Sequence, residues 1–73
     1  MSKPSDMIMR FFKSEHLPPD LRPISGDCEV LAQAMAIRLP EDPEKTAGLR
    51  KLLEAKDCFV RAAIAGRDEE PKG

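Results

Sequence analysis

The sequence predicts an all-α protein in which a short N-terminal helix precedes an antiparallel helical hairpin. Apolar residues recur at helical spacing through two long stretches, and pairs of prolines lie before and between these stretches. The chain has 73 residues, enough for one domain, 1–73, with flexible ends expected at 1–5 and 67–73. A domain this small is marginally stable alone, so assembly into a homo-oligomer is a natural addition.

The first helix is expected near the N-terminus. Ser5 or Asp6 can serve as its N-cap, and the apolar run that follows extends to about Lys13. A helix of this length is not stable without tertiary contacts. The consecutive prolines Pro18 and Pro19 then end regular structure and hold the chain extended or turned.

The second helix is expected from about Leu21 to Leu39. Pro23 fits only in a first turn, and Ser25 is an alternative N-cap. Two apolar stripes appear on a helical wheel, one formed by Val30, Ala34 and Ile37 and the other by Ile24, Cys28, Leu31, Met35 and Leu39. One further long helix cannot cover both stripes. The second stripe is therefore expected to meet another subunit.

The third helix has clear start and stop signals. Asp42 is its expected N-cap, Pro43 occupies the first helical position, and Gly66 suits the residue that follows a helix ending at Ala65. The short link between the second and third helices predicts the antiparallel arrangement. Arg67, although assigned to the tail, is close enough to the helix to take part in a site.

A lysine interrupts the apolar face of the third helix. Lys56 lies among Leu52, Leu53, Phe59 and Val60, where an unpaired charge is costly to bury. Its ammonium can reach a carboxylate such as Asp27 or Glu29, or it can face an anion held between helices. On the charged face, Arg50 and Glu54 are four residues apart, as are Asp57 and Arg61, and at least one of these pairs is expected to form an ion pair.

Composition excludes several functional classes. The net charge of −1 argues against a non-specific binder of DNA or RNA polymers, and no stretch is long and apolar enough for a membrane span, which predicts a cytoplasmic protein. The single histidine, His16, has no assigned nucleophile beside it, and the two cysteines have no metal-ligand spacing. We therefore expect no enzyme, no catalytic residue, no metal and no cofactor.

Two regions resemble the helical-hairpin family of phage anti-CBASS proteins. Residues 43–62, PEKTAGLRKLLEAKDCFVRA, resemble the closing helix of that family. Residues 11–19, FFKSEHLPP, followed by LRPIS at 21–25, are similar to the phenylalanine, His-Leu-Pro-Pro and serine pattern with which its members begin. The resemblance covers about residues 11 to 65.

The resemblance implies a sponge in the cytoplasm of the infected bacterial host. Such proteins sequester the cyclic di- or trinucleotide messengers of CBASS defence without cleaving them, and they assemble as homohexamers. A pocket for these ligands needs an aromatic or apolar wall and cationic donors for the phosphates. Phe11 or Phe12 can supply the wall, although either can instead be a core residue. The polar candidates are His16, Arg50, Lys56, Arg61 and Arg67, with Ser25 and the amides near Gly26 at a helix N-terminus.

The chain departs from the family pattern at two places. Many members carry a tyrosine where this chain has Ser14, and a basic residue where it has Gly26, followed here by Asp27. These changes weaken the expected dinucleotide site, so a trinucleotide or another signalling nucleotide stays open as the ligand. Two alternatives also stay open: a structural or protein-binding hairpin, and a sponge for the cyclic ADP-ribose type signals of Thoeris defence.

Overall fold

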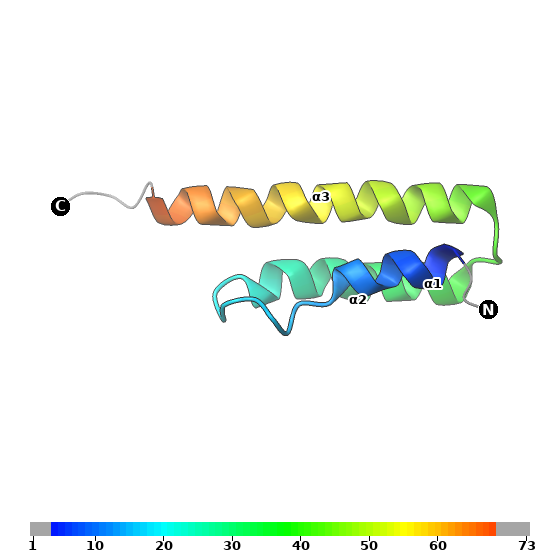
Figure 1. Cartoon of the computed structure of the whole chain (residues 1–73), viewed down its shortest axis with the longest axis horizontal. Coiled ribbons are helices and arrows are strands. Elements are labelled where there is room, and N and C mark those ends of the chain that lie inside the picture. The colour runs from blue at the N-terminus through cyan, green and yellow to red at the C-terminus, as the bar shows by residue number, and fades with distance from the viewer. Residues whose placement is uncertain (1–3, 69–73) are drawn as a thin grey trace.

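The computed structural model describes residues 4–68, and this part of the chain is helical with no strand (Figure 1). Helix α1 spans Pro4–Met9 and continues into the 3₁₀ helix η1, Arg10–Phe12. Helix α2 spans Arg22–Arg38, and helix α3 spans Pro43–Asp68. The expected all-α class is therefore confirmed.

Helix α1 begins earlier than the sequence predicted. Pro4 and Ser5, which were assigned to a flexible end, lie in α1, and Ser5 is buried. Its hydroxyl donates a hydrogen bond to Glu41 Oε1 at 2.8 Å, and its amide donates to Glu41 Oε2 at 3.4 Å. A carboxylate at a helix N-terminus satisfies donors that have no partner within the helix. This contact joins α1 to the turn before α3.

Helix α2 begins next to Leu21, as predicted, and not at the alternative cap. Its N-cap is Leu21, Pro23 lies in the first turn, and Ser25 is a buried residue inside the helix whose amide donates to the Leu21 carbonyl at 3.2 Å. The prediction of Ser25 as N-cap is therefore wrong. At the other end, Leu39 adopts an extended conformation, as expected of a residue that precedes a proline.

Helix α3 begins as predicted and ends later. The Asp42 carboxylate accepts a hydrogen bond from the Glu44 amide at 2.8 Å, the expected N-cap contact. Gly66 is not the residue that ends the helix, because Gly66, Arg67 and Asp68 all belong to α3. The remainder of the predicted tail, 69–73, and the residues 1–3 lie outside the described part of the chain.

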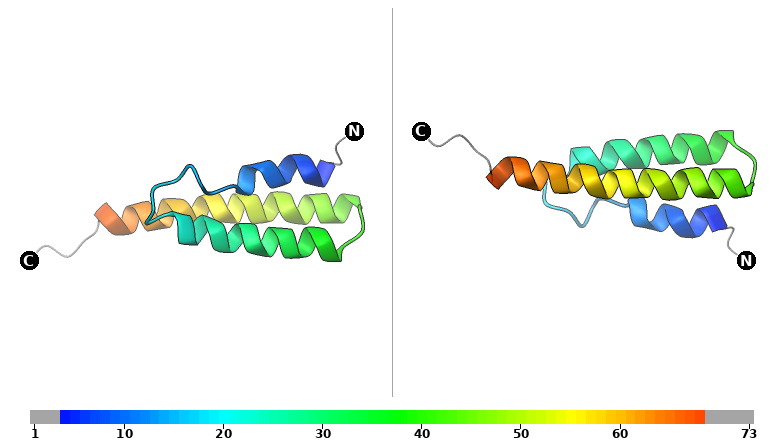
Figure 2. Two further views of the ribbon diagram at one scale, coloured as in Figure 1. Left: turned by 90° about the horizontal axis from the view of Figure 1, so that it is seen from below. Right: turned by 90° about the horizontal axis from the view of Figure 1, so that it is seen from above.

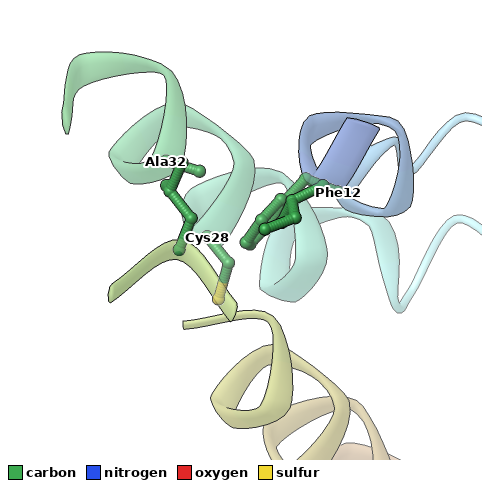
Figure 3. Close-up of a cluster of buried hydrophobic side chains, with 5 residues drawn as sticks. Phe12, Cys28 and Ala32 are labelled. Carbon is green, nitrogen blue, oxygen red and sulfur yellow. The ribbon is translucent and has the colours of Figure 1, made fainter. Parts of the chain in front are cut away.

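The core lies where α1, η1, α2 and α3 meet (Figures 2 and 3). Phe12 is fully buried and points from η1 toward Cys28 and Ala32 of α2. Ile8 and Leu49 complete the buried cluster, against which Met9, Leu52 and Leu53 pack. Phe12 thus takes the core position that the sequence offered as the alternative to a ligand-stacking wall.

The two stripes of α2 do not divide as predicted. Cys28, from the stripe assigned to another subunit, faces the core together with Ala32, whereas Leu31 and Leu39 of the same stripe are exposed. Val30 and Ile37, from the other stripe, are 66% and 84% exposed in the single chain. An apolar stripe left open on one chain is a candidate contact surface.

Helix α3 is longer than its neighbour. Its 26 residues make about 39 Å of helix, against about 26 Å for the 17 residues of α2. Residues 13–21, the connecting segment between η1 and α2, lie toward the C-terminal half of α3 (Figures 1 and 2). Asp20 of this segment contacts Arg67 of α3. The connecting segment and α3 together form the candidate site.

Candidate ligand-binding site

A hollow of about 270 Å³ lies between the connecting segment and α3. His16 and Leu17 form its wall on the connecting segment, and its α3 side is formed by Lys56, Asp57, Val60 and Arg61. These four α3 residues share one side of the helix because positions three or four residues apart are neighbours on its surface. The structure therefore brings together three predicted site residues, His16, Lys56 and Arg61.

Lys56 has a partner that the sequence did not indicate. Its side chain is only 12% exposed, and Nζ donates a hydrogen bond to the Phe11 carbonyl at 2.8 Å. The same ammonium is 3.4 Å from Asp57 Oδ1. The expected partner carboxylates, Asp27 and Glu29, do not take this role. Because the ammonium is used within the chain, Lys56 contributes less to the hollow as a ligand donor than its charge suggests.

Arg61 is the more available cation. Its side chain is exposed, and one guanidinium nitrogen lies 3.3 Å from Cys58 Sγ. A guanidinium has five N–H donors, so this contact leaves donors for a ligand phosphate. Among the described residues, neither of the predicted pairs, Asp57 with Arg61 or Arg50 with Glu54, forms an ion pair. The carboxylate of Asp57 is instead beside Lys56.

The charge of the hollow follows from these contacts. Lys56 and Asp57 offset each other, so Arg61 carries the uncompensated positive charge, and His16 is an exposed hydrogen-bonding group on the opposite wall. Leu17 and Val60 supply apolar surface. A guanidinium, an imidazole and an apolar wall suit a small anionic ligand with a flat ring.

Phe11 is the aromatic candidate that the structure leaves accessible. Its side chain is 63% exposed, and its carbonyl is held by Lys56, so the Phe11 backbone lies beside the helix that lines the hollow. A stacking role therefore stays open for Phe11 and not for Phe12.

Ser25 and Gly26 do not form the predicted anion site at a helix N-terminus. Both lie inside α2, and the Arg22 and Ser25 amides already donate to the carbonyls of Pro18 and Leu21. The Ser25 hydroxyl is fully buried and has no hydrogen-bond partner in the described structure. Gly26 lies under the connecting segment, since a Cβ there would be 3.8 Å from the Ser14 hydroxyl. In the described chain, neither residue therefore lies at an open helix N-terminus, where the predicted phosphate contact was expected.

Two predicted arginines lie outside the hollow. Arg50 lines a separate hollow of about 460 Å³ near the turn that precedes α3, together with the acidic Glu41 and Asp42. Arg67 donates from Nε and a terminal nitrogen to the two Asp20 carboxylate oxygens, at 2.6 and 2.8 Å. The structure thus separates both residues from His16 and Arg61.

An apolar hollow lies on another side of α3. The sequence predicted an apolar stripe on α2 that contributes to it, but not the hollow itself. It has a volume of about 590 Å³, and its lining combines residues of α2 and α3: Ile24, Asp27, Cys28, Leu31, Leu52, Phe59, Ala62 and Ala63. Phe59 and Leu31 are 54% and 48% exposed. Burial raises the pKa of the Cys28 thiol; Asp27 adds to this effect and Lys56 opposes it.

Sequence reasoning missed several residues that shape the first hollow. Leu17 and Val60 line it, Asp57 neutralises Lys56, and Asp20 pairs with Arg67. Leu17 and Asp57 directly follow the predicted site residues His16 and Lys56 in the sequence, and this adjacency could have indicated them. Asp20 follows the two prolines, but nothing in its local sequence indicates a partner almost fifty positions away.

Among residues 4–68, no group of three or more His, Cys, Asp or Glu side chains is placed to hold a metal ion. None of the described helices combines the length and apolar character needed to cross a bilayer. Comparison of the chain with protein-family models, curated proteins and solved structures found no match.

Proposed function

We propose that this chain is a phage immune-evasion protein that binds cyclic di- or trinucleotide messengers of bacterial CBASS defence and sequesters them without cleavage. The observation that carries the proposal is the hollow between His16 and Arg61. One wall comes from the FFKSEHLPP run and the other from the 43–62 run, the two regions that carry the resemblance. Segments distant in sequence therefore contribute to one site of suitable chemistry.

The hollow suits part of such a ligand. Arg61 can donate to a phosphate, His16 can hydrogen-bond, and Leu17 and Val60 can contact a base. A volume of about 270 Å³ lies below the roughly 300–1,000 Å³ of sites that enclose a small molecule. We infer that the chain supplies half of each pocket and that a second copy supplies the rest.

The proposal includes a homohexamer of antiparallel helical hairpins in the cytoplasm of the infected host. Support comes from the apolar side chains that the single chain leaves open. Val30, Leu31, Ile37 and Phe59 are each about half exposed or more. Subunit contacts that cover such residues would add stability that a chain of this size lacks.

Titration calorimetry with a panel of cyclic di- and trinucleotides tests the proposal, after light scattering has fixed the oligomer mass. We expect binding to at least one ligand, at a simple fraction of the subunits, and recovery of intact ligand after heating. Arg61→Ala should weaken binding about 10- to 100-fold, because a charge-assisted hydrogen bond is lost. Arg38→Ala, which removes an exposed cation from α2, is the matched control and should bind normally.

A second candidate is a helical hairpin that binds another protein through the apolar hollow of α2 and α3. The exposure of Leu31 and Phe59 favours it. A monomer in solution that binds none of the cyclic nucleotides would favour this candidate over the sponge. The Thoeris alternative is separated by including cyclic ADP-ribose as a competitor in the same titration.

A further inference from the structure

The connecting segment is held to α3 at both ends by a cation. Lys56 Nζ donates to the Phe11 carbonyl at 2.8 Å, just before the segment begins, and Arg67 donates to both oxygens of Asp20 near its end. Lys56 and Arg67 are eleven residues apart, which is about 16 Å along an α-helix. The α3 residues of the hollow lie along this stretch, and His16 lies between the two contacts in sequence.

Chain length alone does not fix the segment. The nine steps from Phe11 to Asp20 reach about 30 Å when extended, nearly twice the distance between the two cations along α3. Two turns take up the excess, closed by the Leu17 amide on the Ser14 carbonyl at 3.0 Å and the Leu21 amide on the Pro18 carbonyl at 2.9 Å. The turns and the two end contacts together determine where His16 lies.

The segment is also joined to α2. Arg22 Nε donates to the Leu17 carbonyl at 2.8 Å, and the Ser14 hydroxyl is 3.4 Å from Glu29 Oε1. These contacts restrain the first half of the segment, whereas Arg67 acts on its end and Lys56 acts on Phe11 of η1, just before its start. Loss of the Arg67 contact therefore frees the end of the segment, and loss of the Lys56 contact removes a restraint next to its start, while Phe12 stays in the core.

We infer that Lys56 and the Asp20–Arg67 pair are positioning residues, which preform the hollow by fastening the connecting segment to α3 and do not contact the ligand. The inference rests on the proposed function. Each cation already has partners within the chain: the Lys56 ammonium contacts a carbonyl and a carboxylate, and the planar Arg67 guanidinium donates to both oxygens of one carboxylate, which offsets its charge. A segment held in its binding conformation loses less freedom when a ligand binds, which raises the affinity.

Amide hydrogen exchange in the ligand-free protein tests the fastening directly. Lys56→Met retains most of the buried stem and removes the ammonium, so it should speed exchange of the Leu17 amide. Asp20→Asn should speed exchange of the Leu21 amide, while the melting temperature changes little because this ion pair is exposed. Lys51→Met, which removes an exposed positive charge from the same helix, is the control and should leave both amides unchanged.

Calorimetry with cyclic GMP-AMP and cyclic tri-AMP as probes then separates positioning from contact. We expect Lys56→Met to weaken binding about tenfold and Asp20→Asn about fivefold. The charge-reversed double variant, Asp20→Arg with Arg67→Asp, should restore both the slow amide hydrogen exchange and the ligand affinity. A direct contact between Arg67 and the ligand would be lost in this double variant.

Three results have distinct meanings. Unchanged exchange in both single variants would overturn the fastening. If the charge-reversed double variant shows slow amide hydrogen exchange but does not recover the ligand affinity, Arg67 contacts the ligand and its positioning role is overturned. Failure of the unmodified protein to bind either probe or any other member of the panel would reject the proposed function. The amide hydrogen-exchange rates would still test whether these contacts hold the connecting segment to α3.

Discussion

Two adjacent phenylalanines should respond very differently to the same substitution. Phe12 is fully buried among Ile8, Cys28, Ala32 and Leu49, whereas Phe11 is 63% exposed. Truncation of a buried phenylalanine to alanine costs about 3–5 kcal/mol, a large part of the stability of about 4–11 kcal/mol expected for 73 residues. Leucine is therefore the better probe, because the variant should still fold.

The expected size of the effect can be worked out from burial. Phe12→Leu should cost about 1.5 kcal/mol, and each kcal/mol lowers the melting temperature of a small domain by about 4–8 °C, which gives a decrease of about 6–12 °C. Phe11→Leu should change stability by less than about 0.5 kcal/mol, since most of its side chain stays in water. If Phe11 stacks on a base, its variant should instead weaken cyclic-nucleotide binding.

Thermal unfolding followed by far-UV circular dichroism measures both variants at several protein concentrations. Equal decreases in melting temperature at every concentration would refute the assignment of Phe12 to the core and Phe11 to the surface. A decrease for Phe11→Leu that grows with concentration would place Phe11 at a contact between copies, because only assembly depends on concentration.

Two further outcomes follow from titratable groups. The hydrogen bond from the Ser5 hydroxyl lowers the pKa of Glu41, with further lowering by the Ser5 amide and Lys45 against an opposing effect of burial. Glu41 should therefore stabilise the fold above its unfolded pKa of about 4.3 and lose this contribution as the pH falls through the lower folded value. In urea unfolding, Glu41→Gln should have a lower free energy of unfolding than the parent at neutral pH and nearly the same free energy in acid. A difference that does not change with pH would contradict this linkage. Exposed Cys58 should react quickly with a thiol reagent and Cys28 only slowly, because Cys28 is buried and its pKa is raised; similar rates for the two thiols, read by mass spectrometry, would contradict its burial.

Local signals in the sequence predicted the helices well. The first helical region ends at Phe12, close to the predicted Lys13, and Asp42 caps α3 through the Glu44 amide. The errors occur where tertiary contacts override such signals. Ser25 is a good cap in isolation, yet Leu21 takes this position because the turn at Pro18 already supplies hydrogen bonds for the first amides of α2.

The candidate site was predicted less completely, for a physical reason. The charge of Lys56 and its place on an apolar face are visible in the sequence, so the need for a partner could be inferred. The partner is a backbone carbonyl at Phe11, and every residue has such a carbonyl, so no pattern of side chains identifies it. A helical wheel has the same limit: it defines the two stripes of α2, but cannot say that Cys28 faces the core while Val30 stays open.

The incomplete hollow and the open apolar surface have a common origin in chain length. The described helices bury only a small core around Phe12, so apolar side chains such as Leu31 of α2 and Phe59 of α3 stay exposed. The hollow beside Arg61 is lined only by α3 and the connecting segment. Neighbouring copies that covered both surfaces would bury apolar side chains and enclose the hollow. On the proposed function, assembly and ligand binding would then stabilise each other, because each favours the same arrangement of α3.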